Sequence, residues 1–370
     1  MNATRAPFRA DHVGSLLRPP ELKRAREQVK QGTLSKERLR EVEDRAIRDA
    51  VALQEGAGLQ AVTDGEFRRA FWHVDFLTGF DGIVATQGQY ALKFHGEGGA
   101  ESETRSMMVV KAKVRRSHPV MLEPFRFLKT STRRTAKLCI PAPTYLHMRG
   151  GCKVVDAQAY PDIEEFWSDI IRAYREEIRD LVAAGCTYLQ IDDVSFACLC
   201  DETIRAQVRR DGEDPHDLPA KYVQVINSLI AERPPSLAVT MHTCRGNHAS
   251  MWMAEGGYDA VAETLFSGAA VDGFFLEYDS ERAGGFEPLR FMPKNKKVVL
   301  GLVSTKTPRL ERKDDLKRRI DAASKYVPLE NLCLSPQCGF ASSEVGNKLT
   351  EDEERRKLEL VVEVAREVWG

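Results

Sequence analysis

The sequence has no long apolar run. No stretch approaches the ~20 residues that a membrane-spanning helix needs, and the first seven residues, MNATRAP, lack the apolar centre of a signal peptide. An excess of one charge is also missing, because 54 basic residues face 55 acidic ones and the formal net charge is -1. We therefore expect a cytoplasmic protein that binds neither a membrane nor nucleic acid.

The chain also lacks the features of a disulfide framework and of a linker between domains. Eight cysteines in 370 residues without a signal peptide favour reduced thiols. Four of them lie in or beside apolar runs, where a free cysteine behaves as a small hydrophobic residue: Cys139, Cys152, Cys186 and Cys333. No stretch rich in Pro, Gly and Ser divides the chain, so residues 1–370 are predicted to form a single domain.

Short apolar or β-branched runs alternate with helical patterns along almost the whole chain. In residues 39–53, apolar side chains recur at spacings of three and four, which marks one face of a helix. Two predicted strands, GFFLEY and KVVLGLV, are continuous apolar runs, as expected when helices cover a parallel sheet. Eight strands, each followed by a crossover, predict an α/β fold, a closed (β/α)8 TIM barrel; a doubly wound open sheet is the alternative. The predicted strands are 8–16, 59–64, 137–141, 188–192, 237–242, 273–277, 297–302 and 331–335, and further helices are expected at 163–184, 218–231, 259–266, 314–326 and 350–368.

Residues 80–135 fit no unit of this barrel. They contain a glycine-rich stretch at 96–99 followed by the strand-like run SMMVVKAKVRR. Strand patterns that flank a glycine-rich turn are typical of a β-hairpin. We interpret residues 80–135 as an insertion between the second and third units that forms a hairpin arm, which covers the barrel mouth or joins a partner subunit in a homo-oligomer.

Metal-binding side chains gather where predicted strands end. His242 and Cys244 lie at the end of the fifth strand, Glu277 ends the sixth, and Cys338 follows the eighth. The loops after the strands of such a barrel form one face, so these residues are expected to converge. An imidazole, two thiolates and a carboxylate suit Zn²⁺. Each residue alone has a plainer role in packing or in turns, but their shared face favours the metal.

Carboxylates and small polar groups follow other predicted strands. His12 and Ser15 lie in the later part of the first predicted strand, Glu66 lies after the second, and Asp192 and Asp193 stand at the end of the fourth. Carboxylates at the mouth of a barrel suit an ammonium group, and their alternative role is to cap the following helix. We expect Asp193 to be a cap, and Glu66 and Asp192 to belong to the site.

Six motifs in chain order resemble the catalytic barrel of cobalamin-independent methionine synthase: VGS, TDGEF, QIDD, MHTC, FFLEYD and SPQCG. The resemblance covers nearly the whole chain but only one of the two barrels of the synthase. It implies a zinc ion held by His242, Cys244, Glu277 and Cys338, and a homocysteine held at its amino-acid end by Asp192, Glu66 and the backbone around Ser15. The implied activity is zinc-dependent methyl transfer to homocysteine or a close analogue through a zinc-bound thiolate.

The chain departs from that family after its seventh predicted strand, where the synthase has Asp-Ile-His-Ser-Pro and this chain reads STKTP at 304–308. The methyl donor therefore stays open between a folate, a corrinoid protein and another donor. Lys306 favours an alternative, zinc-dependent addition of a thiol to an epoxide or similar electrophile, because a cation stabilises a developing alkoxide. A zinc-storing barrel without turnover is a third hypothesis. The candidate catalytic residues are Asp192, Glu66 and Lys306, and the candidate substrate-binding residues are Ser15, Glu66, Asp192, His12 and Tyr145.

Overall fold

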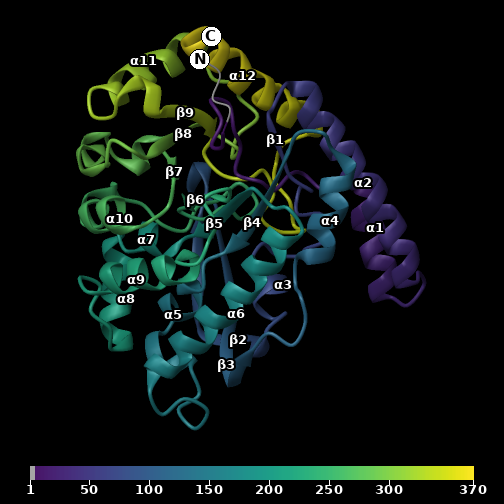
Figure 1. The fold of residues 1–370 in the computed structure, drawn as a ribbon, viewed down its shortest axis with the longest axis vertical. Coiled ribbons are helices and arrows are strands. Elements are labelled where there is room, and N and C mark those ends of the chain that lie inside the picture. Colours follow the sequence, from purple (N-terminus) through teal and green to yellow (C-terminus); the bar gives the residue numbers. More distant parts are fainter. Residues whose placement is uncertain (1–4) are drawn as a thin grey trace.

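The computed structural model describes residues 5–370, apart from the side chains of residues 89 and 90. Residues 1–4 lie outside the described residues. They belong to the N-terminal segment in which we expect no signal peptide. Seven described strands form one sheet in which all neighbours are parallel. The sheet curls through the middle of the molecule (Figure 1). Its order follows the chain: β1 (Ala61–Val62), β4 (Thr135–Pro141), β5 (Tyr188–Asp193), β6 (Ala238–Thr243), β7 (Gly273–Glu277), β8 (Lys297–Val303) and β9 (Leu332–Pro336).

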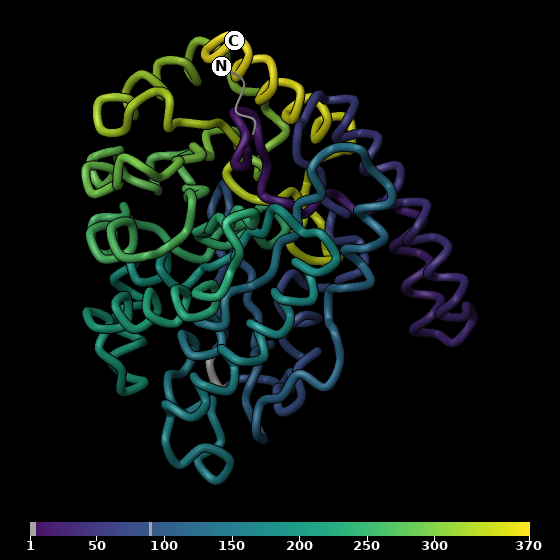
Figure 2. Tube along the Cα trace, viewed as in Figure 1, coloured from purple at the N-terminus to yellow at the C-terminus, as the bar shows by residue number. Residues whose placement is uncertain are grey.

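The N-terminal segment occupies the position of an eighth strand. Ala10 forms an isolated parallel bridge with Leu334 of β9. Further along, the backbone N–H of Leu16 donates to the carbonyl oxygen of Gly65, just after β1, at 3.1 Å. Figure 2 shows this segment beside the C-terminal part of the chain. The segment therefore joins the two edges of the sheet and closes the barrel.

This segment is not the regular strand that we predicted over residues 8–16, and that prediction is wrong. The carboxylate of Asp11 accepts hydrogen bonds from the backbone N–H groups of Phe8 and His12, at 3.2 and 2.8 Å. Such side-chain bonds compete with the ladder of a sheet for backbone donors. The hydroxyl of Thr63 donates to the carbonyl oxygen of Gly14 at 2.6 Å and holds the turn that follows.

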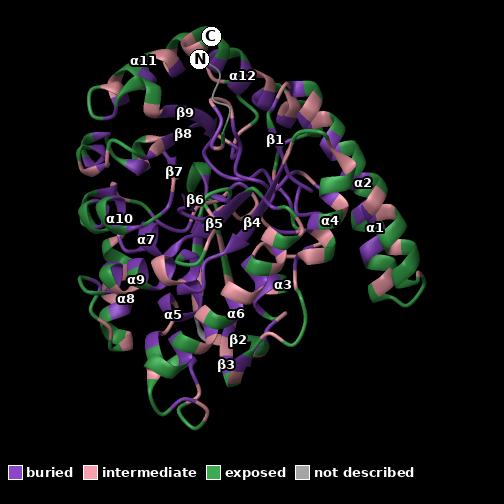
Figure 3. Ribbon diagram, viewed as in Figure 1, coloured by how far each residue is buried: buried purple, intermediate pink, exposed green. Residues whose placement is uncertain are grey.

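Helices surround the sheet, and Figure 3 shows that they have buried and exposed sides. Most of the buried residues are hydrophobic. Ser35 caps the first turn of α2, and Thr350 with Glu353 forms a capping box at α12. The helix predicted over 259–266 is instead a 3-10 turn, η3 (Tyr258–Ala260), followed by α10 (Ala262–Gly268). Across residues 5–370, no helix has the length and apolar character that crossing a membrane requires. The other helices are α1 (Pro20–Lys30), α2 (Lys36–Ala57), α3 (Val74–Leu77), α4 (Leu122–Ser131), α5 (Thr144–Met148), α6 (Ile163–Ala183), α7 (Ser195–Cys198), α8 (Glu202–Asp211), α9 (Leu218–Ile230), α11 (Lys313–Ser324) and α12 (Glu351–Trp369).

The predicted arm is a two-stranded antiparallel hairpin between β1 and β4. Strand β2 (Asp81–His95) pairs with β3 (Glu101–Arg115), and the turn between them contains η1 (Glu97–Gly99). The arm touches the barrel through bridges from His95 to Trp252 and from Val110 to Val155. After the arm, the predicted insertion continues into α4, which packs against β4, α6 and α2. The prediction of an α/β barrel with a hairpin between its second and third units is confirmed.

Candidate functional site

One pocket lies at the carboxyl ends of the parallel strands. Asp192 and His242 stand at the ends of β5 and β6 and are paired in the register of these strands. Cys244 directly follows β6, and Cys338 lies two residues after β9. Six of the predicted site residues line this pocket: Ser15, Glu66, Asp192, His242, Cys244 and Cys338. The common direction of the strands is what brings them together.

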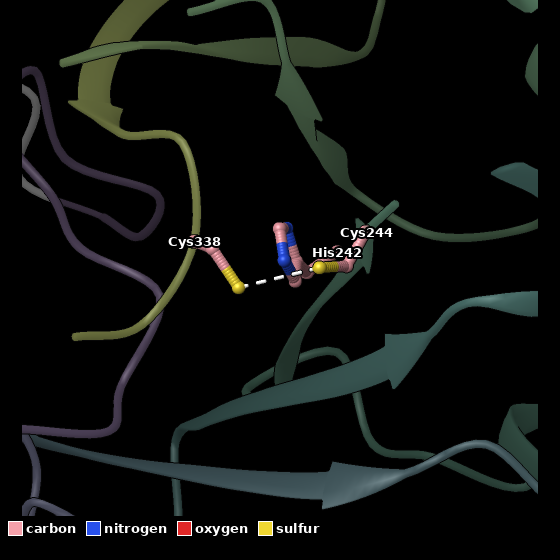
Figure 4. Close-up of side chains that lie close together, drawn as sticks. All are labelled: His242, Cys244 and Cys338. Atoms are coloured by element: carbon pink, nitrogen blue, oxygen red, sulfur yellow. Dashed lines mark hydrogen bonds between the residues drawn. The ribbon is translucent and has the colours of Figure 1, made fainter. Parts of the chain in front are cut away.

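His242, Cys244 and Cys338 point toward one another (Figure 4), and their candidate ligand atoms all lie within 4.8 Å. The His242 ring is oriented by a hydrogen bond from Nδ1 to the carbonyl oxygen of Phe275, at 3.3 Å. Its Nε2 is buried and has no hydrogen-bond partner among the described residues. A backbone carbonyl on one ring nitrogen is the usual support of a histidine that binds a metal through the other.

The two cysteines add a pair of adjacent sulfurs. Their Sγ atoms are 3.3 Å apart, whereas tetrahedral zinc with bonds of about 2.3 Å would hold two sulfurs about 3.8 Å apart. A small side-chain rotation thus gives ligand spacing. The hydrogen bond with Cys338, together with burial, raises the pKa of Cys244 well above its ordinary value, and a bound cation would reverse this preference for the thiol. An oriented imidazole and two sulfurs therefore fit zinc.

Glu277, the fourth predicted ligand, lies outside that group of atoms. Its Oε2 accepts the backbone N–H of Arg245 at 2.9 Å. Its Oε1 lies 2.6 Å from Nη2 of Arg282 and 3.7 Å from Nζ of Lys306. Burial by itself raises the pKa of Glu277, but the three cationic residues outweigh it and lower the pKa, so the group is a carboxylate. The structure pairs this candidate ligand with Lys306, and neither is among the described residues that line the pocket.

Glu66 has an unusual backbone conformation. Its φ of 61° lies in the left-handed region that residues other than glycine rarely adopt, at a cost on the order of 1–3 kcal/mol. The carboxylate of Asp64 accepts the backbone N–H of Glu66 at 2.9 Å and supports the turn. Strain of this kind clusters at functional sites, which is consistent with the position of Glu66 in the pocket.

The Glu66 carboxylate is only partly paired. Its Oε1 lies 3.2 Å from Nη2 of Arg69, while Oε2 is buried without a hydrogen-bond partner in the described part of the chain. Burial raises the pKa of Glu66 to about 7, against the lowering effect of Arg69 and with a further raise from Asp192. Asp192 itself accepts a hydrogen bond from Nε2 of Gln190 at 2.6 Å. Two acidic groups with spare acceptor capacity make this part of the pocket suited to a cation.

Two neighbouring polar residues have structural partners. Asp193 accepts the backbone N–H of Phe196 in α7 at 2.9 Å and also the hydroxyl of Thr144. Asp193 thus binds a backbone N–H of the following helix, as a capping residue would, but the N-cap residue of α7 is Val194 and Asp193 also lines the pocket. Ser15 packs against Gly339, where a Cβ would come within 2.0 Å of the Ser15 Oγ. The loop after β9 therefore needs glycine at this position to lie against Ser15.

His12 and Tyr145 do not line the pocket as described. His12 is buried, and burial followed by the charge of Lys137 lowers its pKa to about 4, so its ring is neutral at neutral pH. Tyr145 packs against the rings of Trp72 and His73, with centroids 5.5 and 4.8 Å apart. Tyr145 therefore contacts Trp72, which lines the pocket.

Several residues of the site were missed in the sequence, among them Trp72, Asn247 and Arg69. Trp72 and Asn247 line the pocket, and Arg69 holds Glu66. Nδ2 of Asn247 donates to the carbonyl oxygen of Gly339 at 2.7 Å and so ties the loop after β6 to the loop after β9. All three lie in loops that follow strands, close to Glu66 or Cys244 in sequence. That proximity was a usable signal.

A wider cleft of about 1150 Å³ lies between the hairpin arm and the barrel. Its walls include residues of β2, β3, η2 (Gly151–Val154), α8 and the segment 252–255. The backbone N–H of Met253 donates to the carbonyl oxygen of Arg245 at 2.8 Å. One wall of the cleft is thus hydrogen-bonded to the residue that follows Cys244 in the sequence.

Comparison with known proteins gives a consistent result. The family model described as the catalytic domain of cobalamin-independent synthase matches residues 8–367. The Bacillus subtilis (strain 168) protein YxjH, described as uncharacterized, is 45% identical over 367 residues, covering 99% of this chain and 96% of that protein. A methionine synthase of Pyrococcus abyssi (strain GE5 / Orsay) is 25% identical over 338 residues, covering 89% and 85% of the two chains.

A comparison with solved structures supports the same family through the fold. The crystal structure of a candidate vitamin-B12-independent methionine synthase from Listeria monocytogenes is 36% identical, covers 99% of both chains and has a TM-score of 0.78. The resemblance seen in the six sequence motifs is therefore confirmed. The chain belongs to the family of the cobalamin-independent synthase catalytic domain.

Proposed function

We propose that this chain is a zinc-dependent methyltransferase whose acceptor is the thiol of homocysteine or a close analogue. Membership of the methionine synthase family supports a methyltransferase. The observation that carries the proposal is that one pocket combines three soft ligands with two carboxylates. A thiol amino acid offers a sulfur to the first group and an ammonium to the second.

Zinc would be held by His242, Cys244 and Cys338, with Glu277 as the fourth ligand once it exchanges its contact with Arg282. The buried Nε2 of His242, which has no hydrogen-bond partner within residues 5–370, supports this ligand set. When bound, the ion supplies the positive charge that favours the thiolate form of a substrate thiol at neutral pH.

The residues of the chain position the acceptor. Glu66 and Asp192 bind its ammonium group, for which the buried Oε2 of Glu66 is a free acceptor in the described structure. Ser15 and the adjacent Gly339 bound the space for the rest of the amino acid. Holding the sulfur in one pose is a large part of the expected rate gain, because it replaces a bimolecular encounter with an oriented one.

We place the methyl donor in the cleft of about 1150 Å³ beside the hairpin arm. Its position next to the residue after Cys244 supports this placement. A folate, a corrinoid or another methyl carrier are the donor classes to compare. The alternative activity, thiol addition to an epoxide, is favoured by Lys306, whose Nζ is buried and has no hydrogen-bond partner in residues 5–370 apart from its 3.7 Å ion pair with Glu277.

The test is methionine formation from homocysteine with one methyl donor at a time. The zinc-loaded protein should form methionine with at least one of methyltetrahydrofolate, methylcobalamin and S-adenosylmethionine. Chelation and Cys338→Ser should abolish the activity. Cys186→Ser should retain it, since this buried thiol lies outside the pocket and bonds to the carbonyl oxygen of Tyr188.

Absence of methionine with every donor, in protein that holds its zinc, would exclude methyl transfer to homocysteine. The same preparation would then be given a thiol and an epoxide. A thioether product that is lost in Lys306→Met would establish the alternative activity.

A further inference from the structure

A second group of metal-binding side chains lies outside the pocket described above. His147 is in α5, Cys152 is in η2, and Glu213 follows the end of α8. One candidate ligand atom from each residue lies within 4.8 Å of the other two. His147 and Cys152 belong to the connection between β4 and α6, and Glu213 belongs to the connection between β5 and β6. Gly150, Lys153 and Asp211 beside them line the wide cleft.

The distances within this group agree with those between the ligands of one tetrahedral ion. Nε2 of His147 lies 3.4 Å from Oε1 of Glu213 and 3.8 Å from Sγ of Cys152. Zinc bonds of about 2.0–2.2 Å to nitrogen and oxygen and about 2.3 Å to sulfur, at tetrahedral angles, place nitrogen and oxygen about 3.4 Å apart and nitrogen and sulfur about 3.6 Å apart. Both observed separations are close to these values.

The His147 ring is turned toward the other two residues by a neighbour. Nδ1 lies 3.0 Å from the hydroxyl of Tyr222 in α9, and the ring packs edge-on against that of Tyr222 with centroids 5.9 Å apart. The other nitrogen, Nε2, therefore faces Cys152 and Glu213. A hydrogen bond that fixes one nitrogen and presents the other is the usual support of a histidine ligand.

A turn with two glycines precedes Cys152, and the second of them leaves room for the Glu213 carboxylate. Gly150 and Gly151 have φ values of 114° and 59°, which favour glycine. A Cβ on Gly151 would come within 2.6 Å of Cγ and Oε1 of Glu213. The backbone N–H of Cys152 also donates to Oε1 of Glu213 at 3.0 Å. The turn at 150–152 is thus shaped around the Glu213 carboxylate.

We propose that His147, Cys152 and Glu213 form a second metal site that binds Zn²⁺ or a similar borderline divalent cation. An imidazole, a thiolate and a carboxylate suit such ions, and the exposure of Cys152 leaves a fourth position open to solvent. The ion ties η2 to the end of α8, two segments that form walls of the wide cleft. Without a metal, the same residues would form only a hydrogen-bonded cluster.

Metal content per chain tests this site. Full-length wild type, Cys152→Ser, Glu213→Gln and a control, Cys200→Ser, are loaded with zinc alone, dialysed and measured by inductively coupled plasma mass spectrometry. Cys152 and Glu213 are at least partly exposed, so their variants should fold. We expect Cys152→Ser and Glu213→Gln each to bind about one zinc ion per chain fewer than wild type. Cys200→Ser should bind as much zinc as wild type. Equal metal in wild type and Cys152→Ser overturns the proposal.

Cobalt gives a second readout that does not depend on the pocket. In the full chain carrying Cys244→Ser and Cys338→Ser, added Co²⁺ should produce a thiolate-to-cobalt absorption band that disappears when Cys152→Ser is added. A band that persists without Cys152, or no band in a folded double variant, overturns the second site. If circular dichroism shows that the double variant is unfolded, the zinc comparison above decides. Each site is thus counted by its own variants, and failure of the proposed function leaves this result unchanged.

Discussion

Replacing Glu66 with glutamine removes a charge that the fold holds at a cost in stability. The side chain is 4% exposed, and burial raises its pKa from 4.5 to about 7 in spite of Arg69. That difference of about 2.5, at 1.36 kcal/mol for each pH unit, means that ionised Glu66 destabilises the fold by roughly 3 kcal/mol relative to the protonated form. Glutamine has nearly the shape of the protonated acid and does not ionise.

The sign of this pH dependence of stability follows from the raised pKa of Glu66. The stability contributed by protonated Glu66 is fully present below pH 4.5 and is lost as the pH rises through about 7. As the pH rises from below 4.5 to above 7, the free energy of unfolding of Glu66→Gln should therefore increase by roughly 3 kcal/mol relative to that of wild type. Urea unfolding at about pH 5 and pH 8 measures most of this increase, roughly 2.5 kcal/mol, because pH 5 already lies above the lower limit. Glu263→Gln, at an exposed position, is the control and should differ from wild type equally at both pH values.

Glu66→Gln should also weaken the binding of homocysteine. A hydrogen bond to a charged group contributes about 1.5–3 kcal/mol, so homocysteine affinity should fall by about tenfold to a hundredfold. A thiol of similar size without an amino group should bind as before, as measured by calorimetry. A stability difference that does not change with pH would refute the argument from burial, and equal losses for both thiols would refute the ammonium contact.

Three further predictions concern the other site residues. Cys244→Ser and Cys338→Ser should each lose most of about one zinc per chain, because each removes a soft ligand; elemental analysis that finds full metal in both would contradict the ligand set. Asp192→Asn should weaken homocysteine binding about tenfold in calorimetry and keep its metal, since its proposed partner is the ammonium group; loss of metal would contradict that role. Lys306→Met should lower the free energy of unfolding by about 1–3 kcal/mol, because the buried Glu277 carboxylate loses one cation. An unchanged urea midpoint would show that Arg282 alone is sufficient to stabilise the Glu277 carboxylate.

The order of the barrel units and the candidate metal ligands could be predicted from the sequence. Continuous apolar runs mark β7 and β8 because parallel strands are covered on both sides. Cys244 and Cys338 are recognisable because they follow such runs, and parallel strands end at one face. The hairpin arm was predictable from local pattern as well, since its pairing partners are close in the chain.

Interactions between distant loops were decided only by the tertiary structure. The sequence places Glu277 at a strand end, but its contact with Arg282 and Lys306 depends on which cations the loops after β7 and β8 bring to it. Likewise, the local sequence around His147 does not predict its contact with Glu213, which lies 66 residues later in the chain. The distance between Nε2 of His147 and Oε1 of Glu213 is 3.4 Å. A side chain's type follows from the sequence. Its partner depends on packing, because a carboxylate or an imidazole takes whichever complementary group the fold places within a few ångströms.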